Sequence, residues 1–385
     1  MTENNNLKYY SLQEIECKIH GRTDETQSPL PLFWNGSAVE VNVTGSELWI
    51  DLEVDFDVHE PWSGYSLNGA FISRQMLMAG RYKLCLFRNM STDSIKNIRF
   101  FRELQAMSED NANHLLIHGF YSDGSFFPVP DRTYKLEFIG DSITSGEGTY
   151  GAKQEDDWIP MFMSSSKNYA VMVSEAIDAD YRLLSQGGWG VFCSWDNKPY
   201  ENLPSCYEKI CGLLKGETNQ KLGALKPYSF SSWQPDAVII NLGTNDASAF
   251  YQPAWQDPVT GESFQQHLLP DGSYDPSDLN RLKQAIIDFL STIRRNNPKA
   301  FIIWAYGMAG YELTLPIAEA VSEYQKQMKD KNVSFLQLPN TTDETVGSRC
   351  HPGPKSHEQS AKILTEYLKT VLYEKSPLAM GFCTP

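Results

Sequence analysis

Residues 138–148 read FIGDSITSGEG, and this stretch decides how the larger part of the chain folds. The apolar run YKLEFI at 134–139 enters it as a buried strand, and the small residues that follow allow a sharp turn. Ser142 lies in that turn, where a serine is most often the N-cap of a following helix. A serine at a strand end can also expose its hydroxyl to a substrate, so the turn indicates either a cap or a nucleophile.

Downstream of this turn, apolar strands alternate with amphipathic helices. The expected strands are 134–139, 181–185, 237–243, 300–307 and 333–338, and the expected helices lie near 168–177, 277–295, 315–330 and 356–374. Ser277 is the expected cap of the longest helix. Because alternating strands and helices form βαβ units, we expect a three-layer α/β/α domain with a mostly parallel sheet over residues 132–385. Such sheets bind ligands at the carboxyl ends of their strands.

The first third of the chain has a different periodicity. Residues 37–58 alternate between apolar and polar side chains, which is typical of half-buried strands. Further short apolar runs, separated by turn residues, lie at 69–72, 82–87, 95–101 and 113–121. This pattern predicts a β-sandwich or jelly-roll accessory domain over residues 1–131, and the run PVPDR at 128–132 marks the expected boundary.

The composition limits the classes of function. With 33 basic and 48 acidic residues the formal net charge is −15, which repels nucleic acid and anionic lipid. There is no stretch of about 18 apolar residues, and the first ten residues lack a basic segment followed by an apolar one. We therefore expect a cytoplasmic protein without a membrane partner. The 7 cysteines lack CxxC spacing, which argues against a disulfide framework and a zinc site.

Four segments with chemically useful side chains follow the expected strands. Ser142 comes after the first strand, the glycines of SQGGWG (185–190) after the second, Asn245 of GTND after the third, and His351 of CHPGPKSHE after the last. Taken singly, each has an ordinary explanation as a cap, a turn or a loop residue. Together they supply a nucleophile, hydrogen-bond donors and a general base at one edge of one sheet, which favours catalysis.

The blocks GDSITSGEG, GTND and HPGPKSHE, in this order, resemble those of the SGNH (GDSL-like) hydrolase superfamily. The β-rich segment before KLEFIGDSIT is similar to the jelly-roll domain that precedes the hydrolase domain in carbohydrate esterase family 2. The resemblance implies that Ser142 is the nucleophile and His351 the general base, with no cofactor or metal. It also implies an oxyanion hole made by the Ser142 N–H, the Asn245 amide and the N–H of Gly190, with Gly188 as the alternative glycine.

The chain departs from these families before the histidine. Where they commonly carry an acid, two or three residues before it, this chain has Ser348 and Arg349. We therefore expect a Ser-His dyad, in which a backbone carbonyl holds the second ring nitrogen of His351 or an acid such as Asp343 or Glu344 arrives from upstream.

Two further residues near these blocks receive structural interpretations. Asp141, next to the nucleophile, is expected to support the turn by hydrogen bonds rather than to transfer protons. His357 is expected to be a surface histidine at the start of the last helix.

The connections around the candidate site are rich in aromatic residues. Their flat apolar faces and polar tips suit a pyranose ring, although the same residues could pack the loops or support an oligomer interface. The candidates for substrate contact are Trp189, Trp195, Phe250, Tyr251 and Trp255.

These observations lead to a functional hypothesis. We expect a carbohydrate O-acetyl esterase that deacetylates xylan- or mannan-derived oligosaccharides through an acetyl-serine intermediate, so its partner is an acetylated oligosaccharide. The alternatives are an esterase or lipase for other short-chain acyl esters and a carbohydrate-binding protein with a decayed hydrolase site.

Overall fold

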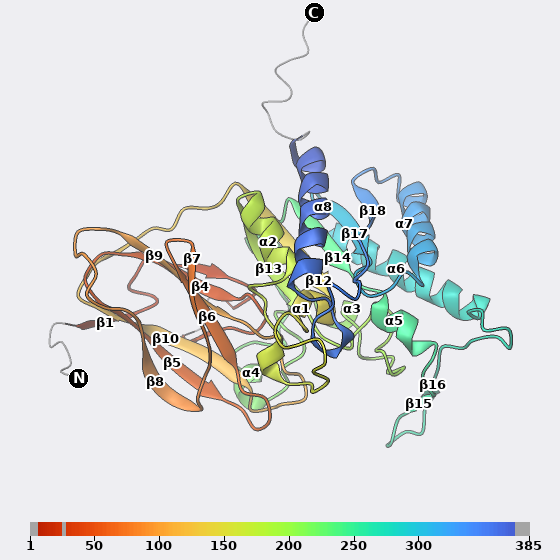
Figure 1. Ribbon diagram of the computed structural model, residues 1–385, viewed down its shortest axis with the longest axis horizontal. Coiled ribbons are helices and arrows are strands. Elements are labelled where there is room, and N and C mark those ends of the chain that lie inside the picture. Colours follow the sequence, from red (N-terminus) through yellow and green to blue (C-terminus); the bar gives the residue numbers. More distant parts are fainter. Residues whose placement is uncertain (1–6, 25–27, 374–385) are drawn as a thin grey trace, which may run out of the picture. The chain divides into compact units, whose positions relative to one another are not determined.

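The computed structural model describes residues 7–24 and 28–373, which form two compact units (Figure 1). The first unit comprises the described residues of Met1–Asp131 together with Trp158–Ser166 and Cys206–Tyr228, and the second comprises Arg132–Asp157, Lys167–Ser205 and the described residues after Ser229. Two segments of the first unit therefore follow the expected 131/132 boundary in the sequence, and that boundary stays a prediction.

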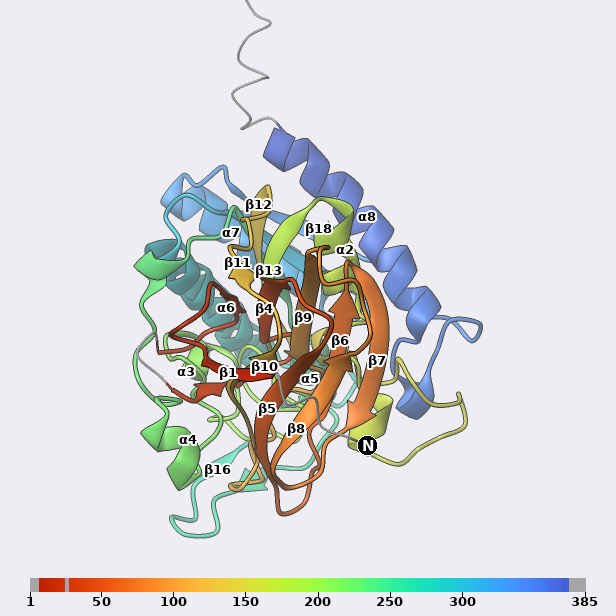
Figure 2. The same cartoon turned by 90° about the vertical axis from the view of Figure 1, so that its left-hand side faces the viewer.

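The first unit is built from two antiparallel sheets (Figure 2). One sheet has the order β1 (Lys8–Ser11), β10 (His114–Ser122), β5 (Leu48–Asp55) and β8 (Gly80–Phe87), and β3 (Leu30–Pro31) also pairs with β10. The other has the order β11 (Phe126–Phe127), β4 (Ala38–Val43), β9 (Lys96–Arg102), β6 (Trp62–Leu67) and β7 (Ala70–Met76), and β2 (Lys18–His20) also pairs with β4.

Alternation along these strands produces the core of the first unit. Alternate side chains of β4 and β5 point into one apolar cluster, which also contains residues of β9 and β10. The buried members from β4 and β5 are Val39, Val41, Val43, Leu48, Ile50, Leu52 and Val54. Two antiparallel sheets that share a core make a β-sandwich, as the period of two predicts.

Two later segments belong to this unit, and one of them, Trp158–Ser166, completes a buried polar group. The fully buried carboxylate of Glu103 accepts hydrogen bonds from Ser164, Ser165 and Ser166, all of which lie beyond the first 131 residues. The unit also contains η1 (Pro160–Phe162) and α4 (Glu217–Lys221), and α3 (Pro204–Tyr207) lies where the chain enters it.

The second unit is a parallel sheet covered by helices (Figure 1). Its strand order is β13 (Ala179–Ser185), β12 (Tyr134–Gly140), β14 (Ala237–Asn241), β17 (Phe301–Tyr306) and β18 (Val333–Gln337). Its helices are α1 (Ser142–Ser145), α2 (Tyr169–Ala176), η2 (Phe230–Ser232), α5 (Thr244–Ala249), α6 (Pro276–Asn296), α7 (Thr314–Met328), η3 (Ser348–Cys350) and α8 (Pro354–Tyr373). A small hairpin joins β15 (Trp255–Gln256) to β16 (Ser263–Phe264).

The helices pack in pairs, α2 with α8 and α6 with α7. Helix α6 shows how sequence sets an element: apolar residues recur at helical spacing on its buried face, and it ends before Asn297-Pro298. Its N-cap is Asp275, which accepts the N–H groups of Ser277 and Asp278, so the expectation of a Ser277 cap is wrong. Pro276 occupies the first helical position, which places the cap one residue before it.

The predicted fold class, a β-sandwich followed by an α/β domain with a mostly parallel sheet, is confirmed. Among the residues that the structure describes, no helix is long and apolar enough to cross a membrane. The same residues contain no group of three or more His, Cys, Asp or Glu side chains arranged to hold a metal ion.

Candidate active site

The turn after β12 holds Ser142 at the first position of a short helix. Asp141, not Ser142, is the N-cap of α1, because its carboxylate accepts the N–H of Ile143 at 3.0 Å. Gly140 is required before it, since a Cβ there would lie 2.0 Å from the Thr144 hydroxyl oxygen. The cap function that the sequence allowed for Ser142 is thus taken by its neighbour, and the serine hydroxyl is available for another partner.

That partner is His351. Its Nε2 lies 2.9 Å from the Ser142 Oγ, and its Nδ1 lies 2.9 Å from the backbone carbonyl oxygen of Arg349. A carbonyl can only accept, so Nδ1 carries the proton and Nε2 is free to accept the serine hydroxyl. This is the tautomer in which an imidazole can deprotonate a serine during attack.

Of the groups considered for orienting His351, the one that lies beside its Nδ1 is a backbone carbonyl, that of Arg349. Asp343 is exposed and pairs with Lys153, at 3.1 Å between Oδ1 and Nζ, and Glu344 is also exposed. Glu147 lies closer, with its Oε1 3.8 Å from the His351 Nε2, and it is buried. Sequence reasoning gave Glu147 no role, although it stands within the opening stretch, because its burial depends on contacts with distant residues.

Asn245 lies in the first turn of α5 and reaches back to the serine turn. Its Nδ2 donates to the Asp141 Oδ2 at 3.2 Å and to the Trp189 carbonyl at 3.0 Å. Asp141 thereby joins two of the sequence blocks, and its supporting role stays a prediction. The pKa of Asp141 is raised to about 7, mainly by complete burial; the charges of Asp246 and Glu147 act in the same direction, and the hydrogen bond from the Ile143 N–H acts in the opposite one.

The residues that follow the glycine segment are held by Asp246, which has no site role in the sequence-based prediction. Its buried carboxylate accepts the N–H groups of residues 191, 192 and 193 at 2.8–3.2 Å. A Cβ at Gly190 would lie 2.4 Å from this carboxylate, so no side chain fits there. The N–H of Gly190 donates to the Cys193 carbonyl at 2.9 Å. Gly188 has φ +79° and lies against the Trp195 ring.

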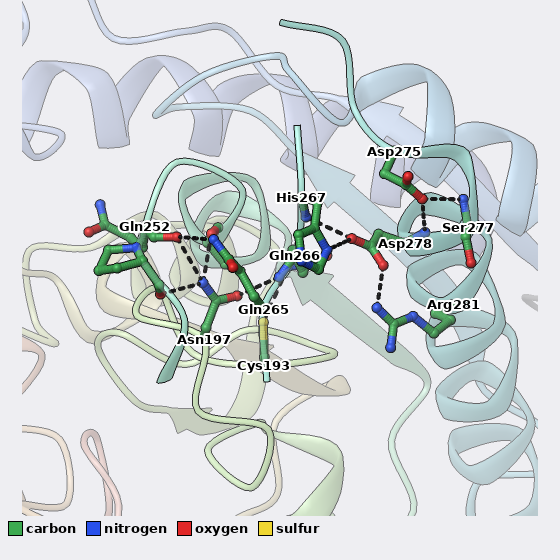
Figure 3. Close-up of polar contacts among 12 residues, drawn as sticks. Cys193, Asn197, Gln252, Gln265, Gln266, His267, Asp275, Ser277, Asp278 and Arg281 are labelled. Carbon is green, nitrogen blue, oxygen red and sulfur yellow. Dashed lines mark hydrogen bonds and ion pairs between the residues drawn. The ribbon is translucent and has the colours of Figure 1, made fainter. Parts of the chain in front are cut away.

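A second polar network binds Cys193 and Asn197, which follow the glycine segment in the chain (Figure 3). The amide of buried Gln266 donates to the Asp246 carbonyl and to the Cys193 sulfur, at 3.1 and 3.2 Å. Its backbone N–H donates to Asn197, whose own amide donates to three carbonyls in residues 249–253. The glycine segment is therefore rigidly placed beside α5.

The five aromatic candidates differ in their accessibility. Trp195 and Tyr251 are exposed, at 47% and 61%, whereas Trp189 and Trp255 are half-buried. Phe250 is only 3% exposed, because its ring packs on a neighbouring tyrosine at 4.5 Å. Trp195 and Tyr251 therefore offer free ring surface, and Phe250 serves mainly to pack the loop.

The interpretation of His357 as a surface residue is wrong. It lies in the first turn of α8, as expected, but its ring is completely buried and stacks on Tyr169. Its Nδ1 accepts the Tyr169 N–H at 3.1 Å, and burial lowers its pKa to about 3. The neutral ring is a packing element of the core.

Comparison with known proteins assigns the chain to a family. The family model of GDSL-like lipases/acylhydrolases matches residues 136–364, which is more than half of the chain. The chain therefore belongs to the GDSL-like lipase/acylhydrolase family, and the resemblance drawn from its sequence blocks is confirmed.

Three relatives narrow the comparison. The solved structure of an acetyl xylan esterase from the rumen bacterium Butyrivibrio proteoclasticus is 54% identical, with a TM-score of 0.94 over 96% of this chain and 100% of that one. A family two carbohydrate esterase from Clostridium thermocellum shares the fold, with a TM-score of 0.76 at 23% identity over 93% of this chain and 99% of that one. An acetylxylan esterase/glucomannan deacetylase from Cellvibrio japonicus is 24% identical over 250 residues, 64% of this chain and 60% of that protein. The chain spans only 37% and 60% of the lengths of the first two curated relatives that it matches.

Proposed function

We propose that the protein is a serine esterase that removes O-acetyl groups from xylan- or mannan-derived oligosaccharides. The observation that carries the proposal is the pair of 2.9 Å contacts at His351, to the Ser142 hydroxyl and to the Arg349 carbonyl. The names of the relatives, acetyl xylan esterase and acetylxylan esterase/glucomannan deacetylase, support the choice of an acetylated carbohydrate.

The chemistry follows from these contacts. Ser142 Oγ attacks the acetyl carbonyl carbon while its proton moves to the Nε2 of His351. Collapse of the tetrahedral intermediate breaks the bond to the sugar oxygen, which takes the proton back from His351, and acetyl-Ser142 remains. Water then attacks the acetyl group with His351 again accepting the proton, and acetate leaves as Ser142 regains its hydrogen.

The oxyanion would be stabilised by N–H groups around Ser142. We propose the backbone N–H of Ser142, the Asn245 amide and a glycine N–H, as the family resemblance implies. The Gly190 N–H is bonded to the Cys193 carbonyl, so Gly188 remains in the proposal beside Gly190. Asn245 can bind the oxyanion only by exchanging one of its two bonds, and replacing it with alanine is expected to lower turnover about 10²–10³-fold.

The ring surfaces of Trp195 and Tyr251 are the proposed contacts for sugar, because both are exposed and belong to loops that follow strands β13 and β14. The other candidates, Trp189, Phe250 and Trp255, remain predictions with less free surface. The cytoplasmic location and the lack of nucleic-acid and membrane partners also remain predictions.

The deciding experiment compares substrates. Acetate release is measured from acetylated xylo- and manno-oligosaccharides beside hydrolysis of p-nitrophenyl butyrate and octanoate, with the parent chain and the Ser142→Ala variant. We expect fast release from the oligosaccharides that depends on Ser142. Equal rates on the longer acyl esters would favour the general esterase, and oligosaccharide binding without serine-dependent acetate release would favour the decayed site.

A further inference from the structure

The general base has a buried carboxylate nearby that lies outside the usual triad geometry. Glu147 is only 3% exposed, and its Oε1 lies 3.8 Å from the His351 nitrogen that faces Ser142. In a triad the carboxylate would contact the opposite nitrogen, Nδ1, which here faces the Arg349 carbonyl. The same Glu147 oxygen accepts from the Arg349 Nε at 2.9 Å, so one residue pair touches both sides of the imidazole.

Arg349 has an unusual backbone that requires anchoring. Its φ is +53° and that of Cys350 is +56°, a conformation that is unfavourable for residues with a Cβ. The anchors are three: the side-chain Nε on Glu147, the Nη1 on the Asp156 carbonyl at 2.9 Å, and the backbone N–H on the Glu155 carbonyl at 2.7 Å. Together they hold the Arg349 carbonyl where the His351 Nδ1–H can donate to it.

Glu147 is also tied to the nucleophile. It follows Gly146, the C-cap of α1, and its backbone N–H donates to the Ser142 carbonyl at 3.0 Å. The next residue, Gly148, packs on the base, because a Cβ there would lie 2.6 Å from the His351 Cβ. Glu147 therefore moves with the serine turn while its carboxylate holds the arginine that orients the histidine.

We propose that Glu147 and Arg349 are positioning residues that together replace the missing triad acid. Arg349 orients His351 through its carbonyl. Glu147 fixes Arg349 and places a negative charge beside the imidazolium that forms during attack. Arg349 in turn engages Glu147 and keeps it beyond hydrogen-bond distance of Nε2, which leaves that nitrogen to Ser142. This inference rests on the proposed esterase function and deepens it.

Because Glu147 and Arg349 carry opposite charges, replacing one or the other should shift the pH profile of activity in opposite directions. The groups that face this region are Glu147 and the buried Asp141, the guanidinium of Arg349, and buried His357, which is neutral because burial lowers its pKa to about 3. Removing the carboxylate of Glu147 destabilises the imidazolium. Removing the guanidinium of Arg349 stabilises the imidazolium and frees Glu147 to bind its Nε2–H in competition with Ser142.

The test is the pH profile of kcat/KM with p-nitrophenyl acetate for three variants. In Glu147→Gln we expect the acid limb to move to lower pH by about one unit, with the plateau lowered about tenfold. In Arg349→Met we expect the limb to move to higher pH by a similar amount. The double variant should return the limb close to that of the parent while the plateau stays low, because the orienting carbonyl is no longer anchored.

A matched control comes from a second arginine–carboxylate pair of the same unit. Arg294 donates its Nε to Asp330 at 2.6 Å and its Nη1 to backbone carbonyls, as Arg349 does. Asp330→Asn is expected to leave the acid limb and plateau unchanged. If Glu147→Gln does not fold, Arg349→Lys replaces it: the retained charge should keep the limb in place, while loss of the planar fork lowers the plateau.

A second readout separates this inference from the proposed function. The rate at which Ser142 is phosphorylated by diethyl p-nitrophenyl phosphate, followed by mass spectrometry, depends on base assistance but not on the natural substrate. If Ser142 is labelled at the normal rate but no acetate is released, the deacetylase proposal is wrong and the role of Glu147 and Arg349 is unaffected. Glu147→Gln and Arg349→Met variants that are folded and slow but whose acid limbs, in both assays, stay where the parent's lies would overturn the role of the pair, since lost packing alone does not move a limb.

Discussion

Two buried carboxylates, one in each unit, behave in opposite ways. Glu40 in the β-sandwich is buried, which raises its pKa, but the hydrogen bond and charge of His20, at 2.7 Å, lower it to about 2. Asp141 at the edge of the parallel sheet is also buried, yet it faces Asp246 and Glu147, and its pKa rises to about 7.

The opposite pKa shifts of Glu40 and Asp141 indicate different roles for the two regions, stability in the sandwich and function at the strand ends. A buried charge with a partner is compatible with a stable fold, whereas carboxylates placed near one another oppose folding and are usually found where function requires them. In the sandwich, Glu40 thus has a histidine partner, whereas at the strand ends of the second unit Asp141 lies near two other carboxylates. If this contrast holds, substitutions at the strand ends should change activity or its pH dependence, and substitutions in the sandwich should change stability.

The largest expected effect tests the functional side of the contrast. His351→Ala is expected to lower kcat/KM for p-nitrophenyl acetate by about 10⁴–10⁶-fold, because no other group would deprotonate Ser142. The melting temperature should change little, because the His351 ring is partly exposed and its removal breaks only two hydrogen bonds. His118→Ala in the sandwich, which removes a histidine paired with Glu53, is the control and should retain activity. A large loss of stability in His351→Ala would break the contrast.

Sequence alone predicted the parts of this site that are carried by strong local motifs. Ser142 and Asn245 stand a few residues after the buried strands β12 and β14, and His351 lies in the connection between β18 and α8, so the order of parallel strands brings the three to one edge of the sheet. The helix-and-strand alternation likewise predicted the sheet, because apolar periodicity reflects burial on one or two faces.

The supporting residues could not be predicted in this way. Glu147 and Asp246 become important through burial and through N–H or guanidinium partners far away in the sequence, which periodicity does not encode. The burial of His357 is not predictable from its neighbours in the sequence, because nothing local distinguishes this helix position from one that faces water. Segment 158–166 follows the expected boundary, yet its serines complete the buried Glu103 of the sandwich.

The next prediction tests the stability side. Glu40→Gln is expected to cost up to about 3 kcal/mol of unfolding free energy near neutral pH, because it leaves buried His20 without its charge partner. The folded-state pKa of Glu40 is lowered from 4.5 to about 2, so its contribution is present above pH 4.5 and is lost as the pH falls towards 2. Urea unfolding of parent and variant between pH 2 and 7 should therefore show curves that converge at the acid end.

The control for this experiment is an exposed ion pair in the same unit. Glu217→Gln removes the partner of Lys221 on α4, where both side chains are mostly exposed, and should have little effect at any pH. Equal losses of unfolding free energy in the two variants would mean that the buried Glu40–His20 pair stabilises the fold no more than an exposed ion pair does. Activity per folded molecule should be unchanged in both variants.

The last prediction concerns Asp141, whose effect on stability has the opposite sign to that of Glu40. Its pKa is raised from 3.8 to about 7 in the folded chain, so the folded state holds its proton where the unfolded state has released it. Between pH 4 and 7 this group therefore makes the fold less stable as the pH rises.

Asp141→Asn removes that titration while keeping an oxygen that can accept the Ile143 N–H. Relative to the parent, the melting temperature of the variant should rise steadily across this interval, whatever its value at pH 4. A constant difference would show that Asp141 is ionised throughout, and the contrast between the paired sandwich and the strained strand ends would then lose its clearest member.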